Sequence, residues 1–364
     1  MAKPRLSKSG VSWTDYSWGV IDGCTKVSEA CKNCYAEGMA QRFWAARPFS
    51  EVQMHPERLE APLNTGKGRV FVAPMGDLFN EKVGFQFIDQ VFAVMALCPQ
   101  HTFQVLTKRP ERMLEYFSFK HRDVKILTEM QMITAELDDI KDEEIIGKNN
   151  VEELRLLTRG LPFRNVWLGV TAENQQRADE RIPVLLKVPA TVHFVSVEPM
   201  LGPVDLTKIK WAKIPVNPEN YDGMNIPVPN EMWSLNNILT SRPADEWNLA
   251  KVGLDWVICG GESGPHARPT HPDWARSLRD QCTAAGVPFY FKQWGEWIPW
   301  DQISLSSIHD ELRKALNKTL PITIIDNEIG PHTMPNQVKV SKVGTKKAGN
   351  LLDGQTWQQM PEVA

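Results

Sequence analysis

The sequence predicts an α/β fold: a full or partial parallel β/α (TIM-like) barrel with a helical insertion and a C-terminal appendage. Short β-branched or aromatic runs alternate with helix-like stretches, which is the pattern of parallel βαβ units. About seven such units in roughly 290 residues favour a barrel, although an open doubly wound sheet would give the same alternation. Each run also ends in polar or glycine residues, as expected where a pocket lies at the carboxyl ends of the strands. The runs cover residues 16–21, 69–74, 102–107, 165–171, 191–197, 255–259 and 288–292.

The composition is that of a soluble globular protein, with 42% apolar and 23% charged residues among 364. A mean hydropathy of -0.33 and the lack of a long uncharged apolar run predict no membrane segment. The first ten residues are basic and polar and have no apolar core of a secretory signal, so we expect a cytoplasmic protein. A net charge of -3 argues against a chain coated for nucleic-acid binding but leaves room for a local basic groove.

Helices follow from the spacing of apolar residues. Trp274, Leu278 and Cys282 recur at i, i+4 and i+8, on one face of a helix that should end at Gly286. The spacing predicts that Cys282 is buried, and the apolar run that ends at Cys98 predicts the same for that residue.

Two stretches interrupt the alternation within residues 1–300, which we take as the barrel domain. Residues 117–160 carry apolar residues at alternating steps of four and three, which predicts a peripheral helical insertion. Residues 207–252 contain five prolines and predict a long irregular loop. The alternation stops after Trp300, so we expect residues 301–364 to form a C-terminal extension.

Three of the six cysteines lie within eleven residues, as Cys24, Cys31 and Cys34 in the spacing C-x6-C-x2-C. Thiolates two residues apart can bind one centre, as in zinc and iron–sulfur sites. A structural zinc site would normally have a fourth ligand from a second C-x2-C or a spaced histidine pair, and neither follows in the chain. An iron–sulfur cluster is therefore the favoured interpretation, with zinc and unliganded thiols as alternatives.

The position of these cysteines adds to the prediction. They follow the first strand-like run and lead into a helix whose apolar face would carry Tyr35, Met39 and Phe43. In a β/α barrel the loops after the strands carry the functional residues, and the cysteine loop is the first of them.

This arrangement resembles the radical S-adenosylmethionine superfamily, although the first gap is three residues longer than the usual C-x3-C-x2-C. Over nearly its whole length the chain resembles more closely a phage-associated family of three-cysteine-motif proteins of unknown function. A further likeness to spore photoproduct lyases rests on Lys108 and Asn174. The segments that carry the family resemblance are residues 23–37, 106–112, 166–182, 196–201, 256–269, 287–295 and 344–354.

The superfamily resemblance implies an enzyme that holds a [4Fe–4S] cluster on Cys24, Cys31 and Cys34. Such an enzyme cleaves S-adenosylmethionine to methionine and a 5′-deoxyadenosyl radical, which abstracts hydrogen from a substrate. It also implies an electron donor such as flavodoxin or ferredoxin. The substrate is unknown, and a nucleobase, nucleotide or nucleic acid is the first candidate by analogy.

Polar residues at the predicted strand ends are the candidate binding and catalytic groups. A cation such as Lys108 or Arg109 could bind the carboxylate of S-adenosylmethionine, and Asp77, Glu198 or Asn174 could accept from its amino or hydroxyl groups. Lys108 and Arg109 could instead be a solvated helix start, and Gly260-Gly261 a tight turn. The predicted cofactor-binding residues are Gly76, Asp77, Lys108, Arg109, Asn174, Glu198, Gly260, Gly261 and Glu262. The predicted catalytic residues are Lys108, Glu198 and Cys259.

A second hypothesis is not enzymatic. The chain has thirteen tryptophans, so a zinc- or cluster-stabilised module could bind nucleic acid or protein through an aromatic face. The absence of a fourth zinc ligand motif and the polar strand ends favour the enzyme.

Overall fold

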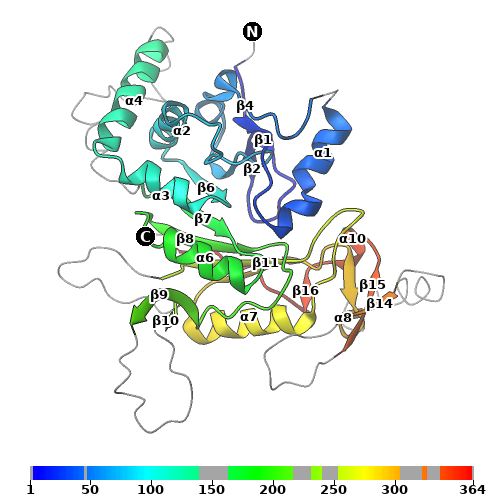
Figure 1. Cartoon of the computed structure of the whole chain (residues 1–364). Coiled ribbons are helices and arrows are strands. Elements are labelled where there is room, and N and C mark those ends of the chain that lie inside the picture. Colours follow the sequence, from blue (N-terminus) through cyan, green and yellow to red (C-terminus); the bar gives the residue numbers. More distant parts are fainter. Residues whose placement is uncertain are drawn as a thin grey trace.

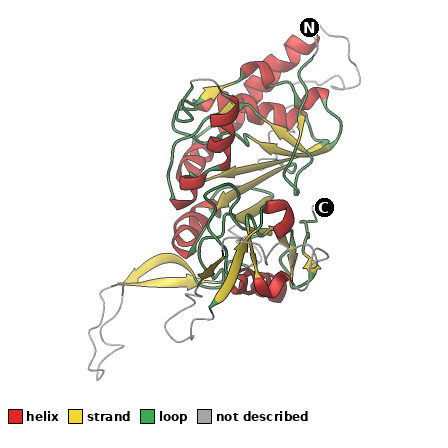
Figure 2. Ribbon diagram, turned by 90° about the vertical axis from the view of Figure 1, so that its right-hand side faces the viewer, coloured by secondary structure: helices red, strands yellow, loops and turns green. Residues whose placement is uncertain are grey.

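The computed structural model of the chain describes residues 3–44, 47–138, 163–215, 231–239, 253–303, 322–325 and 337–362. An eight-stranded sheet forms the centre of the molecule, and most of the helices lie along one side of it (Figures 1 and 2). No helix of the described part is both long and apolar enough to cross a membrane.

The central sheet has the strand order β1-β2-β5-β6-β7-β8-β11-β12. All neighbouring pairs from β2 to β12 are parallel, and only the short β1 runs antiparallel to its neighbour. The strands are β1 (Ser7–Lys8), β2 (Tyr16–Trp18), β5 (Gly68–Val72), β6 (His101–Thr107), β7 (Val166–Thr171), β8 (Val192–Val197), β11 (Trp256–Gly260) and β12 (Phe289–Gln293).

The prediction of an α/β fold with a large, mostly parallel sheet is confirmed. The parallel strands follow one another across the sheet in chain order, without the reversal of a doubly wound fold. Among the described residues β12 makes no strand pairing with β1 or β2, so the sheet is not closed into a full barrel.

The indole of Trp13 shows that the sheet is strongly curved. It contacts Phe71 on β5 at 4.8 Å and Trp256 on β11 at 6.1 Å between ring centroids. In a flat sheet these two strands, with three others between them, would lie about 19 Å apart. The sheet therefore wraps around a layer of buried aromatic rings, to which Trp167 and Tyr290 also belong.

The helices α2, α3, α4, α6 and α7 bury their apolar faces in the main core. As predicted, α7 ends at Gly286, which has the left-handed φ of 68° that favours glycine. Cys98 and Cys282 are fully buried, as their spacing predicted. The helices are α1 (Tyr35–Phe43), α2 (Phe85–Leu97), α3 (Pro110–Ser118), α4 (Arg122–Asp138), α6 (Gln175–Leu185), α7 (Pro272–Ala285), α8 (Trp300–Ile303) and α10 (Thr345–Ala348), with 3-10 turns at Glu29–Asn33, Pro56–Arg58 and Pro62–Asn64.

The segment expected to be a helical insertion contains α4, and residues 139–162 lie outside the described part of the chain. Ile126 and Met130 of α4 are fully buried against the main core. Arg122 forms a buried ion pair with Asp89 of α2 at 2.9 Å. α4 thus packs against the main core, and whether residues 117–160 form a peripheral insertion stays a prediction.

Two antiparallel strands lie where the prolines predicted an irregular loop. β9 (Ile209–Pro215) and β10 (Glu231–Asn236) form a hairpin at the periphery of the molecule (Figure 1). The prolines that suggested a loop lie at the end of β9 or in residues outside the described ranges, so they do not interrupt the pairing.

The C-terminal part packs against the central domain. It contains two small sheets. The first has the strand order β13 (Trp297–Pro299), β15 (Val338–Lys342), β14 (Ile322–Ile325). The second pairs β16 (Leu351–Leu352) with β17 (Gln355–Thr356). Asp353 accepts hydrogen bonds from Arg276 and Arg279 of α7. The backbone around Gln358 runs antiparallel along β12. Whether residues 301–364 form a separate unit stays a prediction.

Candidate metal centre at the carboxyl ends of the strands

The loop with the three cysteines begins at a backbone position that only glycine fits. Gly23 follows β3 (Ile21–Asp22), which pairs with β4 (Gln53–Met54), and has a φ of 90°. A Cβ atom at Gly23 would lie 2.4 Å from the carbonyl oxygen of Glu51. The amide of Cys24 donates to the carbonyl of Phe49 at 2.8 Å. The backbone at Cys24 is therefore held in one position.

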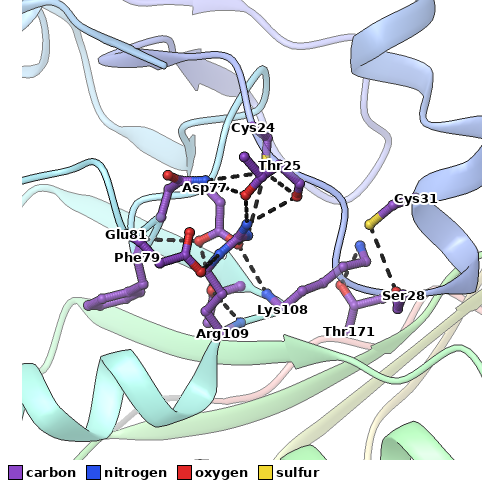
Figure 3. A network of polar contacts seen from close by, with 12 residues as sticks. Cys24, Thr25, Ser28, Cys31, Asp77, Phe79, Glu81, Lys108, Arg109 and Thr171 are labelled. Carbon is purple, nitrogen blue, oxygen red and sulfur yellow. Dashed lines mark hydrogen bonds and ion pairs between the residues drawn. The ribbon is translucent and has the colours of Figure 1, made fainter. Parts of the chain in front are cut away.

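Arg109, at the end of β6, holds the first cysteine from the other side (Figure 3). Its Nη1 lies 3.5 Å from the Sγ of Cys24, and its Nη2 donates to both oxygens of Thr25 at 3.0 and 2.6 Å. The amide of Asn80 lies 3.9 Å from the same sulfur. Two N–H donors thus face the sulfur atom of Cys24.

Asp77 fixes Arg109 in this position. Its carboxylate accepts from Arg109 Nη1 at 3.0 Å and from the hydroxyl of Thr107 at 2.7 Å. It also accepts from the backbone amides of Phe79 and Lys108. Burial disfavours the charged guanidinium, but Asp77, Cys24 and Glu81 together hold the pKa of Arg109 above its usual value. Asp77 and Arg109 therefore hold the cysteine loop in place, and the cofactor-binding role expected for them stays a prediction.

Burial raises the pKa of the Cys24 thiol to about 11 in the metal-free chain, and the nearby charge of Asp77 adds to this shift. Arg109 acts in the opposite direction. A metal ion at this sulfur would have to displace the proton, as it does wherever a thiol becomes a ligand.

The far end of the cysteine loop is fastened to two other strand ends. Glu29 pairs with Arg177 of α6 through two hydrogen bonds of 3.0 and 2.9 Å. Asn33 donates to Glu262, which follows β11, at 3.1 Å. Glu262 is buried and also takes a bidentate bond from Arg268. The loop therefore crosses from the ends of β5 and β6 to the ends of β7 and β11.

The thiols of Cys24, Cys31 and Cys34 are free and half-buried on this loop. Cys31 lies 3.8 Å from the hydroxyl of Ser28, and Cys34 directly precedes α1. In the part of the chain that the structure describes, no group of three His, Cys, Asp or Glu side chains is arranged to hold a single metal ion. The other three cysteines are buried in the core, where burial raises their pKa values.

Two further cations of the strand-end face, Lys108 and Lys292, differ in their partners. The ammonium of Lys108 lies 3.4 Å from the hydroxyl of Thr171 and has no carboxylate partner among the described residues. Lys292 instead forms an ion pair with Glu198, with 2.7 Å between nitrogen and oxygen. The hydroxyl of Tyr35 donates to the carbonyl of Pro74.

The remaining predicted site residues have structural roles. Asn174 caps α6 by accepting from the amide of Arg177. A Cβ atom at Gly76 would clash with Ile21, one at Gly260 would press on Glu198, and one at Gly261 would lie 2.0 Å from the carbonyl oxygen of Trp294. These glycines allow close packing of backbone, and we find no separate ligand role for them.

Cys259 lies next to the carboxyl end of β11, with its side chain in the main core. It is fully buried in the core, 3.6 Å from the sulfur of Met200. Burial raises the pKa of its thiol well above the usual value. The catalytic role predicted for Cys259 stays a prediction.

Sequence reasoning missed the residues that fasten the loop, which are Thr25, Glu29, Asn33, Arg177 and Arg268. Thr25, Glu29 and Asn33 lie between the cysteines, and this position is the signal that the sequence offered for them. Arg177 and Arg268 gave no such signal, because their contacts with the loop join residues far apart in sequence.

A cavity of about 580 Å³ lies beside Cys24. One wall is formed by α1 and the other by the segment that follows it. Within it Arg47 stacks on the indole of Trp44 at 3.8 Å. The cavity is lined by Cys24, Thr25, Lys26, Glu37, Ala40, Gln41, Trp44, Arg47, Pro48, Phe49 and Ser50.

Comparison with known proteins gives a family but no activity. No curated protein matches the chain. The solved structure of a tyrosine-to-phenylalanine mutant of spore photoproduct lyase covers 78% of this chain and 76% of its own, with 9% identity and a TM-score of 0.33. That likeness is too low to define the fold or the function. A family described as a protein of unknown function, DUF5131, matches residues 8–361, and the chain therefore belongs to this family.

Proposed function

We propose that the protein is a radical S-adenosylmethionine enzyme. The observation that carries the proposal is the cysteine loop: it bears three free, half-buried thiols and is fastened at both ends across the carboxyl ends of parallel strands. In β/α folds that edge is where ligands bind.

The residues present suit a [4Fe–4S] cluster held by Cys24, Cys31 and Cys34. Such a cluster takes each cysteine on a different iron, so its ligands need not converge as they would on a single metal ion. Hydrogen bonds to the sulfurs are one means by which proteins tune these clusters, and Arg109 and Asn80 supply N–H groups at Cys24. When bound, the cluster supplies the electron that splits S-adenosylmethionine into methionine and a 5′-deoxyadenosyl radical.

Lys108 is the best candidate to bind the carboxylate of S-adenosylmethionine. Its ammonium has no acidic partner among the described residues, whereas Arg109 is fully engaged by Asp77 and Glu81. A half-buried cation without a counter-ion gains most from an anionic ligand.

On the opposite side of the strand-end face, Glu198 and Lys292 form an ion pair that is only partly exposed. Glu198 can accept from an amino or hydroxyl group, and its contact with Lys292 orients the carboxylate. The buried aromatic layer around Trp13 and Trp256 closes the base of the curved sheet, so a ligand and its radical would be shielded from water from below.

An electron donor such as flavodoxin or ferredoxin follows from this chemistry. The site does not select a substrate, and a nucleobase or nucleotide remains the first to assay.

Anaerobic purification tests the proposal. We expect a brown protein with about four irons per chain. Replacing Cys24, Cys31 or Cys34 by alanine should remove the cluster, whereas Cys282→Ala, in the core, should leave it intact. With dithionite the loaded protein should release 5′-deoxyadenosine and methionine slowly. Stoichiometric zinc, with no iron–sulfur absorption after reconstitution, would instead support a zinc-stabilised binding module.

A further inference from the structure

The helix that follows the third cysteine exposes its apolar face. Tyr35, Met39 and Phe43 recur every four residues along α1, and 50%, 44% and 74% of their surfaces are accessible. The buried residues of α1 are the small Ala36 and Ala40. An exposed stripe of large apolar side chains is typical of a surface that binds a partner.

The surroundings of this stripe are cationic. Lys32, Arg42 and Arg47 have no carboxylate partner among the described residues, although the whole chain has a net charge of -3. The nearby Lys26 is already paired with Glu37 at 2.9 Å. The face made by Tyr35, Met39, Phe43, Lys32 and Arg42, which we call the α1 face, therefore combines apolar contact area with unpaired positive charge.

The α1 face adjoins the cysteines. Lys32 lies between Cys31 and Cys34 in the chain, and Tyr35 is the first residue of α1. The stripe from Tyr35 to Phe43 extends about 12 Å along the helix axis. A partner docked on it would lie beside two of the three thiols, and Figure 1 shows α1 at the edge of the molecule, where a partner can approach.

We propose that the α1 face is the docking site of a small acidic electron-transfer protein. The inference rests on the proposed function, because it requires a redox group at the cysteines. In the transfer the partner loses one electron and is oxidised, and the group held by the cysteines gains it and is reduced. Carboxylates around the partner's redox centre would pair with Lys32 and Arg42, while apolar atoms cover Met39 and Phe43.

The charge and size of the α1 face favour an acidic protein partner over a membrane surface. A stripe of three residues on a nine-residue helix is short for membrane insertion, and the hydroxyl of Tyr35 is tied to Pro74. Unpaired cations in a chain of negative net charge instead give local complementarity to an acidic protein surface.

The test measures binding of a plant-type [2Fe–2S] ferredoxin with an acidic surface by calorimetry, with both the iron-loaded and the metal-free full chain. We expect salt to weaken binding. Arg42→Glu and Phe43→Ser should each raise the Kd about tenfold. The matched changes Lys120→Glu and Met132→Ser, at exposed sites near and on α4, should leave it unchanged. Carbodiimide cross-linking of the complex should join Lys32 to a ferredoxin carboxylate.

Equal Kd values for all four variants, or cross-links confined to other lysines, would overturn the docking site. So would binding to anionic phospholipid vesicles without binding to ferredoxin, which would make the α1 face a membrane surface. An iron-loaded chain that cleaves S-adenosylmethionine with dithionite but does not bind ferredoxin here refutes the docking site alone. A chain that binds ferredoxin here but never holds iron refutes the proposed function and, with it, electron transfer at this face.

Discussion

The guanidinium of Arg109 lies 3.5 Å from the sulfur of Cys24. This contact joins a residue just after the end of β6 to the first cysteine of the loop, although the two are 85 positions apart in the sequence. A substitution that breaks this contact should therefore change both the position of the cysteine loop and the stability of the sheet.

Arg109→Gln should lower both stability and iron retention. The change leaves Asp77 buried without its cation, which typically costs about 3–5 kcal/mol in the free energy of unfolding. Urea denaturation of the metal-free chain measures this loss. The double variant Asp77→Asn/Arg109→Gln should lose less than the two single variants together, and strict additivity would show that the two residues act independently.

The far end of the loop can be released without touching a cysteine. Asn33→Leu removes the hydrogen bond to Glu262, so we expect iron to leave the loaded protein about tenfold faster in the presence of a chelator. Glu57→Gln, at an exposed carboxylate away from the loop, is the control. Equal release rates in the two variants would mean that this anchor does not hold the loop.

Lys108→Ala should weaken binding of S-adenosylmethionine by about 1.5–3 kcal/mol, because a hydrogen bond to a charged carboxylate is lost. Equilibrium dialysis with the cluster-loaded protein measures the effect, and Lys120→Ala serves as the surface control. Unchanged affinity in Lys108→Ala would place the carboxylate elsewhere.

Two glycine-to-alanine changes should have opposite effects on stability. In Gly261→Ala the new Cβ atom would overlap the carbonyl oxygen of Trp294, and we expect a loss of about 2–3 kcal/mol. Gly38→Ala lies on an exposed, uncrowded side of α1 and should gain about 0.5–1 kcal/mol. Thermal unfolding of both variants would show whether the sign reverses as expected.

Asp353 should make a pH-dependent contribution to stability. Burial raises its pKa, but hydrogen bonds from Arg276, Gln302 and Arg279 together lower the pKa by more than burial raises it. The pKa of Asp353 therefore lies below its usual value. The contribution is therefore present above about pH 4 and is lost as the pH falls below that value. Asp353→Asn should cost about 1 kcal/mol at pH 7, and the difference from the wild type should shrink toward pH 2. A gap that stays constant with pH would exclude the charge as its cause.

The strands were predictable because each is a buried β-branched or aromatic run followed by a polar end. The seven predicted runs correspond to β2, β5, β6, β7, β8, β11 and β12, with ends that differ by at most three residues. The periodicity of α1 was also recognisable, but the sequence did not show that Ala36 and Ala40 face inward and Tyr35, Met39 and Phe43 outward. Small residues bury little area, so hydrophobicity alone pointed to the wrong face.

The candidate site was predictable only in part. The strand-end position of Asp77, Lys108, Arg109 and Glu198 followed from the alternation of strands and helices. Their partners did not, because Asp77 and Arg109 satisfy each other through contacts between different strand ends. Of the two predicted cations, Arg109 pairs with Asp77, whereas Lys108 has no carboxylate partner in the described part of the chain, and pairing of this kind cannot be deduced from residue type.

The backbone beside β12 also bears on self-association. An edge strand offers a row of unpaired amides and carbonyls to any other chain. Here the amide of Phe291 donates to the carbonyl of Trp357, and the amide of Gln359 donates to Phe289. These few residues occupy the hydrogen-bonding positions that a neighbouring molecule would need. The segment thus protects the sheet from edge-to-edge aggregation, and a chain cut after Gly354 should form oligomers in the ultracentrifuge even if its cysteine loop is intact.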